Sequence, residues 1–313
     1  MFSKFWEKLT ENLTQEWQAR IMAPAFAFWT GGLFLYALRQ GWQPLIDRVA
    51  AWSPAEGIVA IIAALGILTI STTFVTQFSI PLLRFLQGYW HAPLAGLAVS
   101  RVNGINRKVK EKEERWNWLA QRKASNELGA AQLHEYALLD ANLANFPVDE
   151  NWRLPTRLGN LMRAAEEYPH LHYGLEINIA WPRLWLLLPA STQQEIGRAR
   201  HNLDRAVQTF MWAALFASWA FINPWALMIA VLLALMFYQP ILQTGGAYGE
   251  LLKAAFDLHR FKLYEAMHWP RPESPHNEVR SGQSLINYLY RAEASKKIKY
   301  DFPTPEDNTP PRP

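Results

Sequence analysis

Two uninterrupted apolar stretches decide the fold of this chain: Ala60–Leu68 (AIIAALGIL) and Ala226–Phe237 (ALMIAVLLALMF). A helix on the surface of a soluble protein carries polar residues at every third or fourth position, and neither stretch does. Each stretch also lies inside a longer run that has no Asp, Glu, Lys, Arg or His. Because a bilayer core takes about 20 helical residues, the two stretches predict helices that cross a membrane.

The uncharged runs of the chain predict four such passes. The runs are Ile21–Leu38, Gly57–Leu83 and Ala206–Gly249. The last run is too long for one pass, and Asn223-Pro224 near its middle is a turn signal. We therefore expect two passes joined by a tight turn, at about residues 207–222 and 225–244.

The distribution of Lys and Arg predicts the orientation, because these residues concentrate in cytoplasmic segments. Of the 31 Lys and Arg residues, 16 lie in residues 84–205, ten lie beyond residue 249, three lie in the first 20 residues, and two lie in the 39–56 loop. We expect the long segments and both termini on the cytoplasmic side, with the short loop and the Asn-Pro turn outside.

The expected fold class is all-α, a four-helix polytopic membrane protein with a cytoplasmic helical insert and a helical C-terminal region. The expected domains are an amphipathic interfacial helix at 1–20, a transmembrane hairpin at 21–83, a cytoplasmic helical domain at 84–205, a second transmembrane hairpin at 206–244, cytoplasmic C-terminal helices at 245–295, and a disordered Pro-rich tail at 296–313. Residues 1–20 also fit an ordinary helix packed on the cytoplasmic domain.

Local signals predict some of the cytoplasmic elements. Residues 106–145 favour two helices or one bent helix, and 157–168 favour another. Thr192 followed by Glu195 is a capping-box pattern, which predicts the start of a helix that runs into the third pass. Gly245-Gly246 predicts a break after the fourth pass. Trp181–Pro189 is too short to span a membrane, and it suits an interfacial segment or a buried turn.

Composition excludes several kinds of site. The chain has no Cys, so thiolate metal sites, disulfides and Cys nucleophiles are excluded. The net charge of +4 is too small to favour nucleic acid as a partner, and Glu residues interleave with Lys in the most charged stretch. The 15 Trp residues are typical of proteins with a membrane–water interface.

The densest cluster of titratable residues is E-E-Y-P-H-L-H, which contains Glu166, His170 and His172. Pro169 is expected to break the helix that would align Glu166 with His170, which favours polar residues at a turn over a metal site. With nearby arginines this cluster forms a hypothetical interface site, Arg157, Arg163, Glu166, His170, His172 and Arg183. No catalytic motif is present, and we expect no metal, no cofactor and no enzyme activity.

The second predicted pass carries a polar stripe, in which Ser71, Thr72, Thr76 and Ser79 recur near helical spacing. Such hydroxyls make hydrogen bonds between helices, which is one interpretation. The other is that they line an uncharged pore formed by several copies of the chain.

Four stretches carry a resemblance: PTRLGN at 155–160, Tyr173-Gly174-Leu175, WPRL at 181–184, and YGELLKAAFDLHRFKLY at 248–264. Together they resemble a group of bacterial integral-membrane proteins. The resemblance implies a bacterial inner-membrane setting. It supplies no activity and no catalytic residues.

Three functions remain open on the sequence. The first is a homo-oligomeric pore or channel gated from the cytoplasm, with a membrane-depolarising antiphage effector as a special case. The second is a membrane anchor or scaffold that recruits a cytoplasmic protein partner. The third is an enzyme at the inner membrane interface, with the hypothetical interface site as its centre. The lipid bilayer is a partner in all three.

Overall fold

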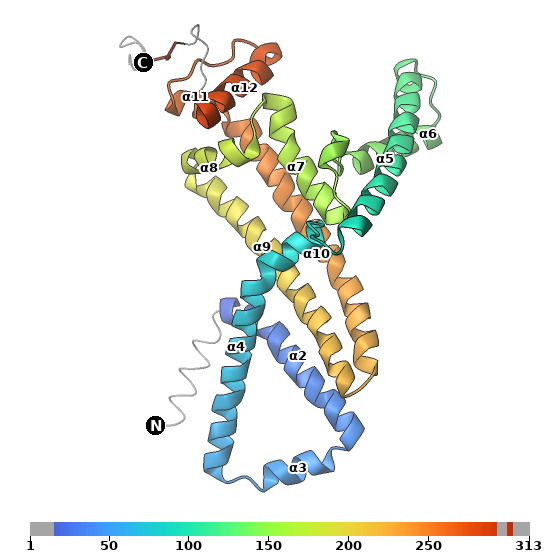
Figure 1. The fold of residues 1–313 in the computed structure, drawn as a ribbon, viewed down its shortest axis with the longest axis vertical. Coiled ribbons are helices and arrows are strands. Elements are labelled where there is room, and N and C mark those ends of the chain that lie inside the picture. The colour runs from blue at the N-terminus through green and yellow to red at the C-terminus, as the bar shows by residue number, and fades with distance from the viewer. Residues whose placement is uncertain (1–15, 293–298, 303–313) are drawn as a thin grey trace. The chain divides into compact units, whose positions relative to one another are not determined.

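The structure is a computed structural model that describes the fold of residues 16–292 and 299–302 and the side chains from Ala23 onward. The described residues form helices and connecting turns only, which confirms the all-α class. The helix predicted at 1–20 and the tail predicted at 296–313 lie almost wholly outside the described residues. The elements are α2 (Glu16–Gln40), α3 (Gln43–Ala50), α4 (Pro54–Gln87), α5 (Ala95–Ala124), α6 (Ala130–Leu143), the 3-10 helix η1 (Glu150–Trp152), α7 (Arg157–Tyr173), α8 (Ile177–Leu187), α9 (Ala190–Leu215), the 3-10 helix η2 (Phe216–Phe221), α10 (Trp225–His259), α11 (Phe261–Ala266) and α12 (Pro275–Arg291) (Figure 1).

The chain divides into two compact units. Unit 1 comprises residues 1–85 and 201–244, and unit 2 comprises residues 86–200 and 245–313. The chain therefore passes from unit 1 to unit 2, back to unit 1 within α9, and again to unit 2 within α10.

Two helices of the described chain, α4 and α10, are long and apolar enough to cross a membrane. Only 6% of the most apolar window of α4 is buried inside the protein, and only 22% of that of α10. A core helix of a soluble protein would be buried over most of such a window. The sequence predicted four passes, and only these two are found, partly because the third apolar run changes from α9 to η2 after Leu215.

Unit 1 is held together by aromatic side chains between α2, α4 and the α9–η2 segment. Trp212 is buried with Ala25 and Val75. The indole N–H of Trp29 donates to Ser71 Oγ at 3.2 Å, which joins α2 to α4. Gly32 is required at its position, because a Cβ there would overlap the indole ring of Trp219.

Unit 2 has its own hydrophobic core, built from α8, the start of α9, the end of α10, α11 and α12. Its most deeply buried side chains include Leu184, Phe256, Tyr264 and Leu285. The stretch predicted as an interfacial segment or a buried turn is helix α8, whose Ala180 and Leu184 face this core.

Two glycines allow α12 to lie directly on the end of α7. Gly174 ends α7 in the left-handed conformation, with φ +67°, and its N–H bonds to the His170 carbonyl. A Cβ at Gly282 of α12 would overlap the Tyr173 carbonyl oxygen. The Tyr173 hydroxyl also donates to Asp257 at 2.5 Å, which ties α7 to α10.

Three local predictions were wrong. Pro169 lies inside α7 and does not break it. Gly245 and Gly246 lie inside α10 and do not break it. A Cβ built on Gly245 would lie 3.0 Å from Leu158 Cδ1 of α7, so this glycine makes room for the packing of α7. Thr192 lies in the first turn of α9, because that helix already begins at Ala190.

The segment predicted as two helices or one bent helix is two, α5 and α6, which lie side by side as a hairpin (Figure 1). Arg115 of α5 makes a two-pronged ion pair with Glu135 of α6, with both N–O distances at 2.8 Å. Asn126 takes a positive φ of 58° in the connecting turn, where asparagine is tolerated better than most residues.

Candidate functional site

The start of α7 is fixed by side chains from the PTRLGN stretch. The Thr156 hydroxyl caps the helix by accepting the Gly159 N–H at 3.0 Å. The Asn160 amide is buried, and it bonds to both the N–H and the carbonyl of Leu154 at 2.8 Å. A Cβ at Gly159 would overlap the Gln87 carbonyl, so only glycine allows this contact. The stretch therefore holds α7 and the loop before it in one position.

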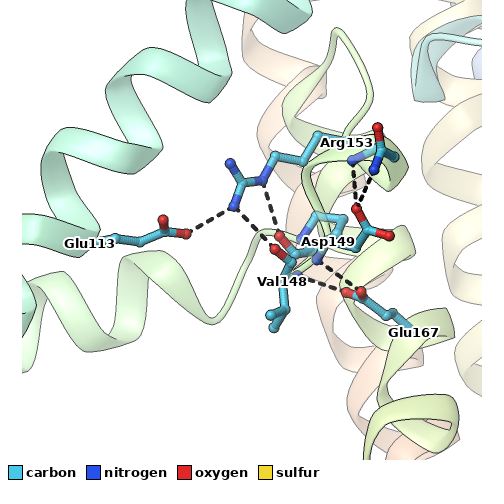
Figure 2. Close-up of polar contacts among 7 residues, drawn as sticks. Glu113, Val148, Asp149, Arg153 and Glu167 are labelled. Carbon is cyan, nitrogen blue, oxygen red and sulfur yellow. Dashed lines mark hydrogen bonds and ion pairs between the residues drawn. The ribbon is translucent and has the colours of Figure 1, made fainter.

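The loop before α7, residues 147–153, is held by two buried charged side chains (Figure 2). Arg153 is 6% exposed, and its guanidinium donates to the Pro147 carbonyl at 3.1 Å and to Glu113 of α5 at 2.9 Å. Glu167 of α7 is 2% exposed, and its carboxylate accepts the backbone N–H groups of Val148 at 2.7 Å and Asp149 at 3.0 Å. Burial of these charges is compensated by hydrogen bonds at each group.

This loop forms one wall of a pocket of about 520 Å³. We call it the hairpin pocket, because side chains of the α5–α6 hairpin also line it, together with side chains of α7 and Lys253 of α10. Its lining comprises Glu113, Trp116, Asn117, Asp140, Leu143, Ala144, Phe146, Pro147, Val148, Ala164, Glu167, Tyr168, Leu171, His172 and Lys253.

The hairpin pocket combines apolar and polar groups. Phe146, Val148 and Leu171 supply apolar surface, and Val148 is 70% exposed at its edge. Asp140 accepts the Trp116 indole N–H at 3.0 Å, so that ring has a fixed orientation. A mostly apolar lining with a few oriented polar groups is the usual character of a binding pocket.

The neighbouring face of α7 carries a second cluster around Arg163. The Arg163 guanidinium pairs with Glu166 at 3.2 Å and lies over the Trp152 ring at 5.4 Å, and that ring stacks on His170. Within the described chain, Arg163 Nε and His170 Nδ1 are buried without a hydrogen-bond partner. Burial raises the pKa of the Glu166 carboxyl above its ordinary value, and Arg163 opposes this effect. Arg163 and Trp152 also line a pocket of about 350 Å³.

The structure brings together three of the six residues of the hypothetical interface site, Arg163, Glu166 and His170. They meet because α7 continues through Pro169, which puts residues three and four apart on one face. His172 lies elsewhere, in the hairpin pocket, stacked on Tyr168 at 4.1 Å.

The other two residues of that hypothetical site do not join the cluster. Arg157 is exposed at the first position of α7. Arg183 of α8 donates to the Ile179 carbonyl of its own helix at 2.6 Å.

The hydroxyls of α4 mostly bond to their own helix. Ser79 is buried and donates to the Thr76 carbonyl, and Thr76 donates to the Thr72 carbonyl. Ser71 accepts from Trp29, and Thr72 and Thr76 line a pocket of about 40 Å³ within unit 1. A pore lining stays a prediction for these four residues.

Sequence reasoning missed Arg153 and Glu167, the two charged residues that shape the hairpin pocket. A charged residue in a loop is usually solvated, and Glu167 stands beside Glu166 with no pattern to distinguish the two. Only the folded loop identifies their partners.

Within the described residues, no group of three or more His, Asp or Glu side chains lies close enough to hold a metal ion. Comparison with protein-family models found no match, and no curated protein and no solved structure matched the chain. The proposals below therefore rest on the geometry of the chain itself.

Proposed function

We propose that this protein is a bacterial inner-membrane anchor whose unit 2 recruits a cytoplasmic protein partner through the hairpin pocket. The observation that carries the proposal is the pair of buried charges, Arg153 and Glu167, that hold the pocket wall. Burying the charged side chains of a loop residue and a helix residue costs free energy, and the result is a preformed pocket. A preformed pocket loses less conformational entropy on binding than a mobile loop would.

The proposed topology has four passes with both termini inside. Packing inside unit 2 supports a third pass, because Tyr173 and Gly282 are in contact and so share one side of any membrane. If α10 crosses once between these positions, residues 201–224 must cross as well. Residues 206–215 at about 1.5 Å each and the six residues of η2 at about 2.0 Å each span about 27 Å, close to a bilayer core of about 30 Å.

The remaining pass, α2, is supported by its surface. Phe26, Leu33, Phe34 and Leu38 are each about half exposed, which suits contact with lipid. The Lys and Arg distribution supports the placement of unit 2 in the cytoplasm.

The partner is expected to insert an apolar side chain into the hairpin pocket. Leu171 is 41% exposed and Val148 is 70% exposed at the pocket edge, so two apolar contacts are already available to a partner. Apolar anchors in preformed pockets dominate the affinity of many protein interfaces.

Site-specific photocrosslinking tests the recruitment. A photoreactive amino acid at Leu171 is expected to give one major adduct in cells. The same amino acid at Leu186, an exposed leucine of α8, is the matched control. Ala164→Phe fills the pocket and should abolish the adduct at position 171. Equal adducts at positions 171 and 186, or an adduct that survives A164F, would contradict the proposal.

A second candidate, a homo-oligomeric pore, is favoured by one observation. Thr73 and Gln77 of α4 are exposed within a helix whose apolar window is only 6% buried. Polar side chains on a lipid-exposed helix favour contact with another helix or a water-filled path.

The mass of the protein in mild detergent tests this second candidate. A pore requires several copies and ion flux in liposomes. A monomeric mass without ion flux would contradict the pore and favour the membrane anchor. A membrane-interface enzyme has no comparable support.

A further inference from the structure

The short helix α3 has an apolar face that the described chain leaves about half exposed. No residue of α3 is buried. Ile46 and Val49 are 54% and 56% exposed, and Trp42, the N-cap residue just before the helix, is 51% exposed. At about 100° per residue, these three side chains and Leu45 lie within an arc of about 100°, and Gln43, Asp47 and Arg48 occupy the opposite arc. The helix therefore has one apolar side and one polar side.

The polar side is organised as a water-facing surface. Gln43 donates to Asp47 at 3.0 Å along the helix. Arg48 and Asp47 are both exposed. The polar side of α3 therefore suits contact with water, whereas the apolar side does not.

The apolar side continues the surface of a neighbouring helix. The ring of Trp42 contacts that of Phe34 on α2 at 5.9 Å, and Phe34 is 49% exposed. At the other end of α3, Trp52 is 43% exposed just before α4 begins. Figure 1 shows α3 crossing from the end of α2 to the start of α4 without continuing either helix.

We propose that α3 lies in the membrane–water interface, with Trp42, Ile46 and Val49 in contact with lipid. A lipid surface is the occupant that fits, because the apolar side joins the exposed apolar surface of α2, and two tryptophans flank it. In this position α3 holds the linked ends of α2 and α4 apart and at one depth. The inference rests on the proposed membrane placement of α4.

The absence of Cys allows a direct test on the full-length chain. Single cysteines at Ile46, Val49, Asp47 and Ile62 would carry a nitroxide label in vesicles of phosphatidylcholine and phosphatidylglycerol. Collisions with oxygen report lipid, and collisions with a water-soluble nickel chelate report water. Ile62 is 63% exposed on α4 and controls for membrane placement, and Asp47 is the matched control on the polar side of α3.

The oxygen-to-nickel collision ratio is expected to be severalfold higher at positions 46 and 49 than at position 47, and high at position 62. Equal nickel access at 46, 47 and 49 with lipid contact at 62 would overturn the inference and leave the proposed function standing. Protection of 46 and 49 from both reagents would show that protein, such as a second copy, covers this face, and would also overturn it. Nickel access at position 62 would overturn the proposed function as well. Variants are compared only if their elution in detergent matches the parent chain.

Discussion

Arg153 stabilises the wall of the hairpin pocket through contacts that an apolar side chain cannot make. Replacement by Met keeps most of the side-chain length but leaves the Pro147 carbonyl without its donor. Because Glu113 is 43% exposed and can be solvated, the cost comes mainly from the buried carbonyl, about 2 kcal/mol. Denaturant unfolding of the full-length chain in mild detergent would measure the loss. Arg157→Met at an exposed position is the control, with an expected change within about 0.5 kcal/mol. Equal effects of R153M and R157M would contradict this role.

Glu166 gives a prediction for pH dependence. Burial raises its pKa in the folded chain above the ordinary 4.5. The folded state thus binds this proton more tightly than the unfolded chain does. That contribution to stability is fully present below about pH 4.5 and is lost as the pH rises through the folded-state pKa. The unfolding free energy of the wild type is therefore expected to fall relative to that of Glu166→Gln as the pH rises through this window. Unfolding midpoints measured against pH for both proteins test the sign, and parallel curves would refute it.

At the scale of residues, the sequence predicts contacts between side chains at helical spacing, and it does not predict contacts between distant segments. The Glu166–His170 pair was found from the sequence, but its geometry was misjudged because Pro169 was expected to break α7. A proline costs a helix one hydrogen bond, and packing of α7 within unit 2 outweighs that loss. The partners of Arg153 lie on α5 and in its own loop, so no local spacing could reveal them.

At the scale of elements, the contact between α7 and α12 depends on glycine. Gly282→Ala places a methyl group against the Tyr173 carbonyl, and the backbone must shift to relieve it. We expect a loss of about 1–3 kcal/mol in unfolding free energy, the usual cost of overpacking. Gly197→Ala in α9 is the control, because a built Cβ there meets nothing within 4 Å. That control should gain about 0.5–1 kcal/mol from helix propensity. Losses of similar size in both variants would contradict the account.

Helix identity was predictable where apolar periodicity is strong, and helix ends were less so. Two separate helices, α5 and α6, were one of the two interpretations of residues 106–145, and the turn at Asn223-Pro224 was predicted from turn chemistry. Gly245 looked like a break, yet it lies inside α10 and makes room for α7. Glycine can end a helix or allow a neighbouring helix to approach closely, and only the packing partner shows which role applies. Helix α3 was expected as a loop because eight residues give too short a pattern.

At the scale of the whole molecule, the membrane claim rests on exposed apolar surface. α4 and α10 are long and apolar enough to cross a membrane, and both bury little of their most apolar windows. The sequence predicted these two helices, since apolar runs of such length need no tertiary information to be recognised. It could not predict function, because pockets arise from contacts between distant segments.

The most direct test of the account places unit 2 on one side of a membrane. Unit 2 contains both residues 86–200 and residues beyond 244, so exposed positions 125 and 277 must share a side. In this Cys-free chain, Ser125→Cys, Asn277→Cys and Gln43→Cys can each be tested with an impermeant thiol reagent in intact bacterial cells. We predict labelling of position 43 in intact cells, and labelling of positions 125 and 277 only after the membrane is permeabilised. Labelling of 125 and 277 from opposite sides, or of all three from the same side, would contradict the account.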